Sequence, residues 1–197
     1  LGFDRDTALA TVKGFAGLPH RCQKIAEAGD VRWFNDSKAT SPHAAAVAIQ
    51  SFDSIVLIAG GKNKDLDLNE MALHRDHVRA VVATGASADA IEAAFAGHCE
   101  IRKASTMQEA IESARDLARS GDVVLLSPGC TSYDWYANYG QRGEDFGSDV
   151  FEGFERGIHG ATVLLFNYII LLINKLKRRR ASREMQQCSR PRQARRC

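Results

Sequence analysis

Three largely apolar six-residue runs constrain the fold of this 197-residue chain more than any other feature, and they occupy residues 54–59, 80–85 and 122–127. Runs of this length without polar alternation are typical of strands that are buried on both faces, as in a parallel sheet. Segments of helical character separate them, and strands that alternate with helices indicate an α/β fold. The sequence therefore predicts a Rossmann-like, doubly wound, mostly parallel sheet with helices on both faces.

The remaining segments supply the other elements of this fold. Residues 22–28 and 31–35 can pair as a short N-terminal β-hairpin through Gly29 and Asp30. Ser41 and Pro42 suit the cap and the first position of an alanine-rich helix. The other expected elements are helices at 4–14, 42–50, 67–74, 87–96 and 106–119, a weak strand at 99–102, and a long helix after residue 134 with aromatics at Trp135, Tyr136, Tyr139 and Phe146.

Composition divides the chain into two parts, and we predict a domain at 1–156 and a separate tail at 157–197. The tail holds ten Lys and Arg residues and one acidic residue, Glu184, whereas the first part has a net charge of −7. An acidic body argues against nucleic-acid binding by the domain. Five scattered cysteines without a CxxC pair, and the lack of a signal peptide, predict a reduced, cytoplasmic protein.

The tail combines an apolar stretch at 161–173 with a basic stretch at 174–180. A membrane span needs about 20 apolar residues, and the stretch reaches that length only by including His159 and Asn167. The basic flank fits a cytoplasmic membrane anchor. The alternative, which we favour, is a non-domain end without fixed structure beyond about residue 178.

Polar loops follow three of the predicted strands, at 35–41, 60–65 and 127–134. The carboxyl ends of parallel strands meet at one sheet edge, where ligands of such folds bind. Free N–H groups at the start of the helix after residue 41 favour an anion, and Lys38 adds a positive charge. A single polar turn would not indicate a ligand site, but three polar loops that converge on one sheet edge favour one.

Three other kinds of site lack their signatures. No GxGxxG follows the first strand, which argues against a dinucleotide-binding oxidoreductase, and the Gly60-Gly61 loop does not have Walker spacing. His74 and His77 have i, i+3 spacing but no third ligand nearby in the sequence, so we expect no metal site there.

Four motifs resemble the C-terminal domain of the Mur ligases, and in particular the MurD-type, D-glutamate-adding members of that family. They are Gly17-Leu18-Pro19-His20-Arg21, Asn35-Asp36-Ser37-Lys38-Ala39-Thr40, Gly60-Gly61-x-x-Lys64 and Ser127-Pro128-x-Cys130-x-Ser132-x-Asp134. The resemblance extends over residues 1 to about 155 in the expected order. Two departures are that Tyr139 stands where the family often has Phe, and that Gly129 and Thr131 replace small alanines.

The resemblance implies an ATP-dependent ligase of cytoplasmic peptidoglycan precursor synthesis. ATP phosphorylates the carboxylate of UDP-MurNAc-L-Ala, and the amine of D-glutamate attacks the acyl phosphate. The site residues implied are His20, Arg21 and Asp36 for ATP, with Thr40, Lys64, Ser132, Tyr133 and Tyr139 for D-glutamate, and Lys38 and Arg21 as the catalytic pair.

The residue chemistry agrees with these implied roles. The two carboxylates of D-glutamate suit an ammonium and hydroxyl groups. Arg21 can neutralise charge that develops on a phosphoryl group. Asp36 can accept hydrogen bonds from ribose or orient Arg21.

The family also has an N-terminal UDP-binding domain and a central domain that carries the ATP loop and most Mg²⁺ ligands, and neither is found in these residues. We therefore expect this chain to be a fragment that does not turn over alone. The alternative is a degenerate, non-catalytic ligase domain that acts as an interaction module, tethered to a membrane by its tail.

Overall fold

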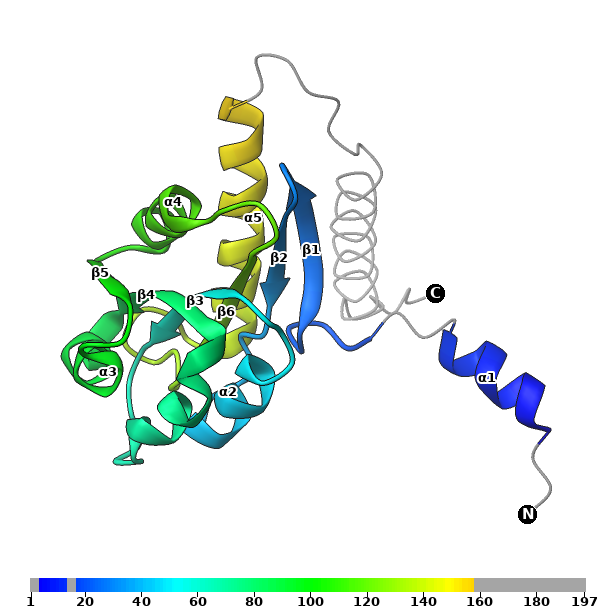
Figure 1. The fold of residues 1–197 in the computed structure, drawn as a ribbon, viewed down its shortest axis with the longest axis horizontal. Helices are drawn as coiled ribbons and strands as arrows, with labels where there is room; N and C mark the ends of the chain where they lie inside the picture. Colours follow the sequence, from blue (N-terminus) through cyan, green and yellow to red (C-terminus); the bar gives the residue numbers. More distant parts are fainter. Residues whose placement is uncertain (1–3, 14–16, 158–197) are drawn as a thin grey trace, which may run out of the picture. The chain divides into compact units, whose positions relative to one another are not determined.

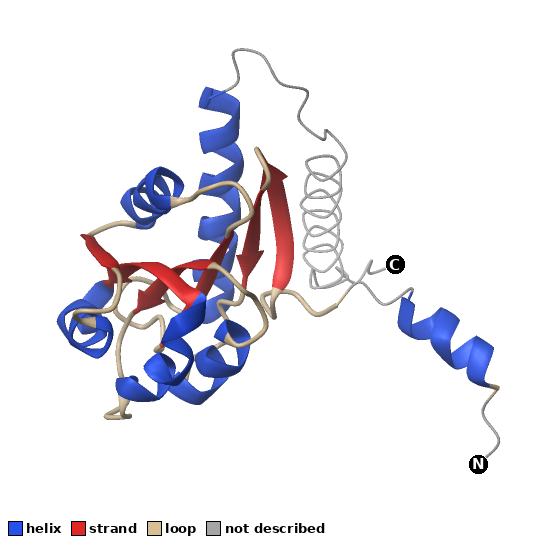
Figure 2. Ribbon diagram, in the orientation of Figure 1, coloured by secondary structure: helices blue, strands red, loops and turns tan. Residues whose placement is uncertain are grey.

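The computed structural model describes residues 4–13 and 17–157, and their order of helices and strands follows the predicted alternation. Figure 1 labels each element, and Figure 2 shows the strands of the sheet with helices against them. The strands are β1 (Gln23–Ala28), β2 (Val31–Asn35), β3 (Ile55–Gly60), β4 (Val78–Thr84), β5 (Glu100–Ala104) and β6 (Val123–Gly129). The helices are α1 (Arg5–Lys13), α2 (Pro42–Ile49), α3 (Ala88–Phe95), α4 (Met107–Leu117) and α5 (Tyr139–Gly157), with 3-10 helices η1 (Leu68–His77) and η2 (Gly85–Ser87).

The six strands form one mostly parallel sheet in the order β1-β2-β6-β3-β4-β5. The β1–β2 pair is antiparallel and every other pair is parallel. Gly29 and Asp30 join the hairpin with φ values of 58° and 62°, the backbone of a tight hairpin turn. The α/β fold class and the hairpin are confirmed. β6, the last strand of the described residues, lies between β2 and β3.

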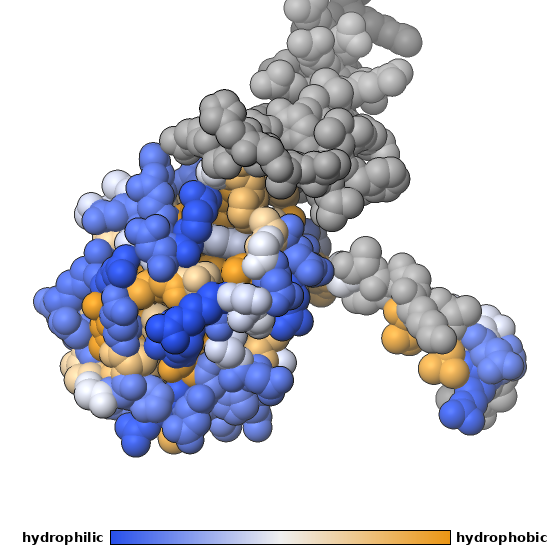
Figure 3. All heavy atoms as spheres, turned by 45° about the horizontal axis from the view of Figure 1, so that its top comes forward, coloured by the Kyte–Doolittle hydropathy of each residue, from blue (hydrophilic) through white to orange (hydrophobic). Residues whose placement is uncertain are grey.

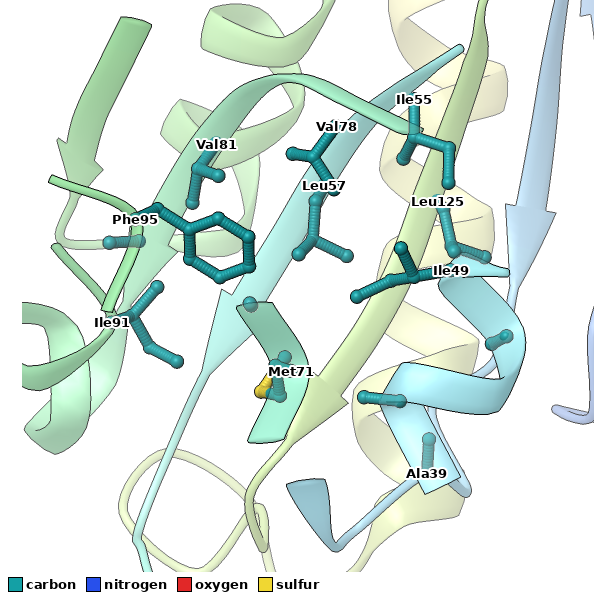
Figure 4. Close-up of a cluster of buried hydrophobic side chains, with 14 of the residues drawn as sticks. Ala39, Ile49, Ile55, Leu57, Met71, Val78, Val81, Ile91, Phe95 and Leu125 are labelled. Atoms are coloured by element: carbon teal, nitrogen blue, oxygen red, sulfur yellow. The ribbon is translucent and has the colours of Figure 1, made fainter. Parts of the chain in front are cut away.

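Alternate residues of the central strands supply two hydrophobic cores, one on each face of the sheet. Ile55 and Leu57 of β3 pack on one face with η1 and α3, a cluster that Figure 4 shows around Met71 and Phe95. Val56 and Ile58 point to the other face, where the cluster includes residues of α4 and α5. Burial on both faces explains why these strands read as unbroken apolar runs.

Hydrogen-bonding side chains set the helix boundaries. Ser41 Oγ accepts a bond from the Ala44 amide at 3.4 Å, and Thr106 Oγ1 accepts one from the Glu109 amide at 3.1 Å. Both are N-caps, which satisfy amides that the helix leaves unpaired. The predicted helix beginning at Ser41 and Pro42 is confirmed.

Two predicted helices differ in form. The helix expected directly after residue 134 begins at Tyr139, because Asn138 Oδ1 accepts a bond from the Gln141 amide at 2.9 Å and caps it there. Trp135 and Tyr136 therefore lie in the preceding loop. The helix expected at 67–74 is the 3-10 helix η1, which has non-helical backbone at His74.

Polar and charged side chains cover most of the described surface seen in Figure 3, with smaller hydrophobic areas between them. Within residues 4–13 and 17–157, no helix combines the length and the apolar character that a membrane crossing requires. Residues 158–197, which include the apolar and basic stretches of the predicted tail, lie outside the described residues.

Candidate functional site

The three polar loops meet at the carboxyl ends of β2, β3 and β6, as the sequence predicts. The Gly129 amide donates a hydrogen bond to the Ala39 carbonyl at 3.0 Å, which joins the loop after β2 to the end of β6. Lys62 and Thr131 exchange two backbone bonds of 2.9 and 3.0 Å, which join the loops after β3 and β6. The loops therefore form one hydrogen-bonded unit.

A fourth loop, which the sequence analysis missed, joins them from the end of β4. Asp134 Oδ2 accepts a bond from the Ala86 amide at 3.0 Å, and Ser87 Oγ accepts one from the Asn63 amide at 3.2 Å. Gly85 is required there, since its φ is +65° and a Cβ would lie 2.2 Å from Asp134 Oδ2. In the sequence, the pair Thr84-Gly85 was the only local signal of this fourth loop, and it resembles the end of an ordinary strand.

His20, Lys38 and Tyr139, three of the predicted site residues, lie together. Lys38 Nζ donates a hydrogen bond to the Tyr139 hydroxyl at 3.3 Å and lies 5.0 Å from the ring centroid. The His20 ring meets the Tyr139 ring edge-on, with 6.2 Å between centroids. The Lys38 amide donates to the His20 carbonyl at 3.1 Å, so the backbone also holds this cluster together.

The first turn of α5 supports this cluster through residues that the sequence analysis did not select. Asn35 Nδ2 donates to the Gly143 carbonyl at 2.8 Å and lies 3.2 Å from His20 Nδ1. A Cβ at position 143 would lie 2.2 Å from the same His20 nitrogen. Ser37 Oγ donates to the Tyr139 carbonyl at 2.7 Å. Only glycine at 143 lets the histidine ring rest against this helix.

Asp36 lies inside the domain, with only 7% of its surface exposed. Its Oδ1 accepts a bond from the Cys22 amide at 3.1 Å, and its Oδ2 accepts one from Ser127 Oγ at 2.8 Å. Burial raises the pKa of this carboxyl, although these two bonds and the charge of Arg21 partly oppose the shift. Partial desolvation of its sulfur and the neighbouring charge of Asp36 also raise the pKa of Cys22 to about 11, although the residue as a whole is exposed. Both oxygens of Asp36 thus bind the protein itself, while the Arg21 side chain is exposed.

The residues predicted to hold D-glutamate differ in exposure. Ser132 is buried, Thr40 is half-buried, and Tyr133 is 68% exposed. Lys64 is exposed, and its ammonium forms no ion pair or hydrogen bond with any residue that the structure describes. Its charge acts on Cys130, whose pKa is raised by burial but lowered in part by Lys64. A free cation beside the loop that carries Ser132 suits a carboxylate ligand.

The loops of the site carry two cations whose chemistry suits an anionic ligand. Arg21 and Lys38 are cations on neighbouring loops, and cations of this kind bind phosphate. Over the described ranges, no group of three or more His, Cys, Asp and Glu side chains is placed to hold a metal ion.

Residues 20–130 match the family described as "Mur ligase, glutamate ligase domain". The UDP-N-acetylmuramoylalanine–D-glutamate ligase of Salinibacter ruber is 45% identical over 146 residues, which are 73% of this chain and 32% of the relative. The enzyme of the same name from Alcanivorax borkumensis is 43% identical over 153 residues, which are 74% of this chain and 34% of the relative. The chain thus spans about a third of the length of these relatives.

Solved structures share the fold at low sequence identity. The UDP-N-acetylmuramate-alanine ligase of Thermotoga maritima has a TM-score of 0.58 at 14% identity, over 79% of this chain and 34% of that one. A bifunctional folylpolyglutamate synthase/dihydrofolate synthase from Yersinia pestis has a TM-score of 0.54 at 19% identity, over 75% of this chain and 35% of that one. With its sequence match, its fold and its joined polar loops, this chain belongs to the Mur ligase family and carries that family's glutamate ligase domain.

Proposed function

We propose that this chain supplies the amino-acid-binding domain of an ATP-dependent ligase that adds D-glutamate to UDP-N-acetylmuramoyl-L-alanine in the cytoplasm. The supporting observation is the hydrogen-bonded unit of loops at 35–41, 60–65 and 127–134, in a chain 45% identical to an enzyme of that name. In this ligase, ATP supplies the energy by converting the substrate carboxylate to an acyl phosphate. The central and N-terminal ligase domains are the partners of this chain.

The charges at the sheet edge support a dicarboxylate ligand. Lys64 carries an ammonium that no described residue neutralises, and a charge-assisted hydrogen bond to a carboxylate is about twice as strong as a neutral one. Thr40 and Ser132 bring hydroxyl groups that can donate to the same ligand. Tyr133 and Tyr139 supply exposed aromatic rings beside it. In this proposal Lys64 anchors one carboxylate and the hydroxyls orient the other.

The nucleotide is assigned to the side of the site that holds His20 and Arg21. The exposed Arg21 guanidinium contacts phosphate oxygens, and Lys38 lies between nucleotide and amino acid, where it stabilises negative charge during transfer. Asp36 contributes indirectly: by accepting a bond from the Cys22 amide, it fixes the end of the loop that carries His20 and Arg21. The Mg²⁺ that accompanies ATP would take most of its ligands from the central domain.

A chimeric enzyme tests the proposal directly. The C-terminal third of the Salinibacter ruber ligase is replaced by residues 17–157 of this chain, and phosphate release is measured with UDP-MurNAc-L-Ala and each glutamate enantiomer. We expect turnover that requires D-glutamate and is not supported by L-glutamate. A soluble chimera that hydrolyses ATP at the same rate with either enantiomer would contradict the substrate assignment.

Lys62 and Lys64 give a matched pair of variants in that enzyme, because both are exposed lysines of one loop. We expect Lys64→Ala to raise the KM for D-glutamate by about tenfold or more, the value of one charge-assisted hydrogen bond. Lys62→Ala should change it by less than about twofold. Equal effects of the two variants would show that the loop contributes only general positive charge.

A further inference from the structure

Arg142 in the first turn of α5 is the most deeply buried cation of the described domain, with 4% of its surface exposed. Its three hydrogen bonds all go to neutral oxygens. Nε donates to Ser37 Oγ at 3.0 Å, and Nη2 donates to the carbonyls of Ser37 at 2.8 Å and Cys130 at 3.1 Å. Among the described residues it forms no ion pair.

This guanidinium bonds two of the four loops of the site and lies close to a third. Ser37 lies next to Lys38 in the loop after β2, and Cys130 lies two residues before Ser132 in the loop after β6. The third nitrogen, Nη1, is buried without a hydrogen-bond partner in the described residues. It lies beneath the loop after β3, where a Cβ on Gly61 would come within 3.2 Å of it.

A buried charge without an ion-pair partner costs free energy that apolar packing would not, and here the more distant charge of Asp134 is the main one that opposes that cost. Burial lowers the pKa of Arg142 to about 10, so the guanidinium is still charged near neutral pH. A planar fork can bond two separate backbone segments at once, which a lysine ammonium on a flexible stem cannot do with the same geometry. The arrangement suits a site in which separate loops must keep a fixed position relative to one another beneath a negatively charged ligand.

We propose that Arg142 is a positioning residue for the amino-acid substrate: it fixes the loop of Ser37–Thr40 against the loop of Cys130–Ser132, and so sets where the Thr40 and Ser132 hydroxyls meet the ligand carboxylates. This inference rests on the proposed function for the identity of the ligand. It does not require Arg142 to touch the ligand, because the residue acts through the loops that it joins.

Hydrogen exchange of the full 197-residue chain tests the loop contact without any ligand. We expect Arg142→Lys to raise amide exchange at Ser37–Thr40 and Cys130–Ser132 by about tenfold or more, with β4 and β5 unchanged. Arg79→Lys is the control, since Arg79 is a part-buried arginine that bonds Asp122, the residue just before β6, at the other end of the strands. Unchanged exchange in both loops, or a rise equal across the whole domain, would overturn the proposal.

A double-mutant cycle on D-glutamate affinity, measured by NMR titration of the same chain, tests the functional part. We expect Arg142→Lys and Ser132→Ala each to weaken binding about tenfold, and the double variant to weaken it by about the same factor, since one acts through the other. Arg79→Lys should leave the affinity unchanged. A hundredfold loss in the double variant would show independent roles and overturn the positioning role. If the unmodified chain binds no D-glutamate, the proposed function fails for the isolated chain, and hydrogen exchange alone decides the role of Arg142.

Discussion

Asp36 Oδ2 accepts a hydrogen bond of 2.8 Å from Ser127 Oγ, across 91 residues of sequence. Asp36 directly follows β2, and Ser127 is part of β6, the neighbouring strand of the sheet. The bond is buried, and the Asp36 amide also donates to the Leu126 carbonyl at 2.8 Å. The polar loop that follows β2 and the end of β6 are thus fixed to each other by one carboxylate.

The raised pKa of Asp36 predicts a specific pH dependence of stability. The folded state holds the proton of this group more tightly than the unfolded state, because burial disfavours the carboxylate. Its contribution to stability is therefore complete below about pH 3.8 and is lost as the pH rises through the raised folded pKa. Urea unfolding between pH 3.5 and about 7 should show this loss in the unmodified chain and not in Asp36→Asn. An NMR midpoint for Asp36 at or below its ordinary value would contradict the prediction.

Gly61→Ala should destabilise the domain and disturb the site. The φ of Gly61 is +125°, and an added Cβ would lie 2.3 Å from the Thr131 carbonyl oxygen, so backbone strain of about 1–3 kcal/mol is joined by a steric clash. Gly97→Ala is the control, because Gly97 also has positive φ, +74°, but nothing within 4 Å of its Cβ position. We expect Gly97→Ala to cost about 1 kcal/mol and Gly61→Ala clearly more, measured by urea unfolding. Equal costs would show that the Thr131 contact is readily relieved.

Two substitutions of Tyr139 separate the ring from its hydroxyl. Tyr139→Phe keeps the aromatic face that lies 5.0 Å from Lys38 Nζ and removes only a 3.3 Å hydrogen bond. Such an exposed bond contributes about 1 kcal/mol or less, so D-glutamate affinity should change by less than about fivefold. Tyr139→Ala removes the ring from both Lys38 and His20 and should weaken binding more. NMR titration of the two variants checks the order, and a larger loss in Tyr139→Phe would assign the role to the hydroxyl instead.

Asp122 should matter for stability and not for ligand binding. It lies at the opposite ends of the strands from the site, and it accepts bonds from Arg79 Nε at 2.9 Å and from Ser54 Oγ at 2.6 Å. Burial opposes its ionisation, yet the bonds from Arg79 and Ser54 lower its pKa overall. Its contribution is present above about pH 3.8 and is lost as the pH falls through the lowered value. We expect Asp122→Ala to cost about 3–5 kcal/mol at pH 7, because it leaves a part-buried guanidinium unpaired.

Urea unfolding at pH 7, about 4 and about 2.5 measures this cost, which should be nearly the same at the two higher pH values and smaller only at the lowest. D-glutamate affinity of the folded variant should stay within about twofold of the unmodified chain. A variant that unfolds at the same urea concentration as the unmodified chain would contradict the structural role of Asp122.

Some parts of the site could be read from the sequence because they depend on neighbours in the chain. The loop after residue 35 was predicted from the strand before it and from Ser41 and Pro42 after it, and all of these signals act within a few residues. The start of α5 was misplaced because aromatic residues at Trp135 and Tyr136 resemble a helix face. Asn138 caps α5 and so sets where the helix begins, but asparagine is equally common in turns and therefore gives no clear signal of a helix start.

The sequence by itself determined which segments become strands, which become helices and which loops are polar, because periodicity and capping act locally. The tertiary structure alone decided that β6 lies between β2 and β3. It also decided that Arg142 and Gly143, more than 100 residues after the loop at Ser37, complete that loop. These contacts join residues that are far apart in the sequence, so they depend on how the helices pack against the sheet. A hydrogen bond between such residues produces no periodic pattern in the sequence from which it could be predicted.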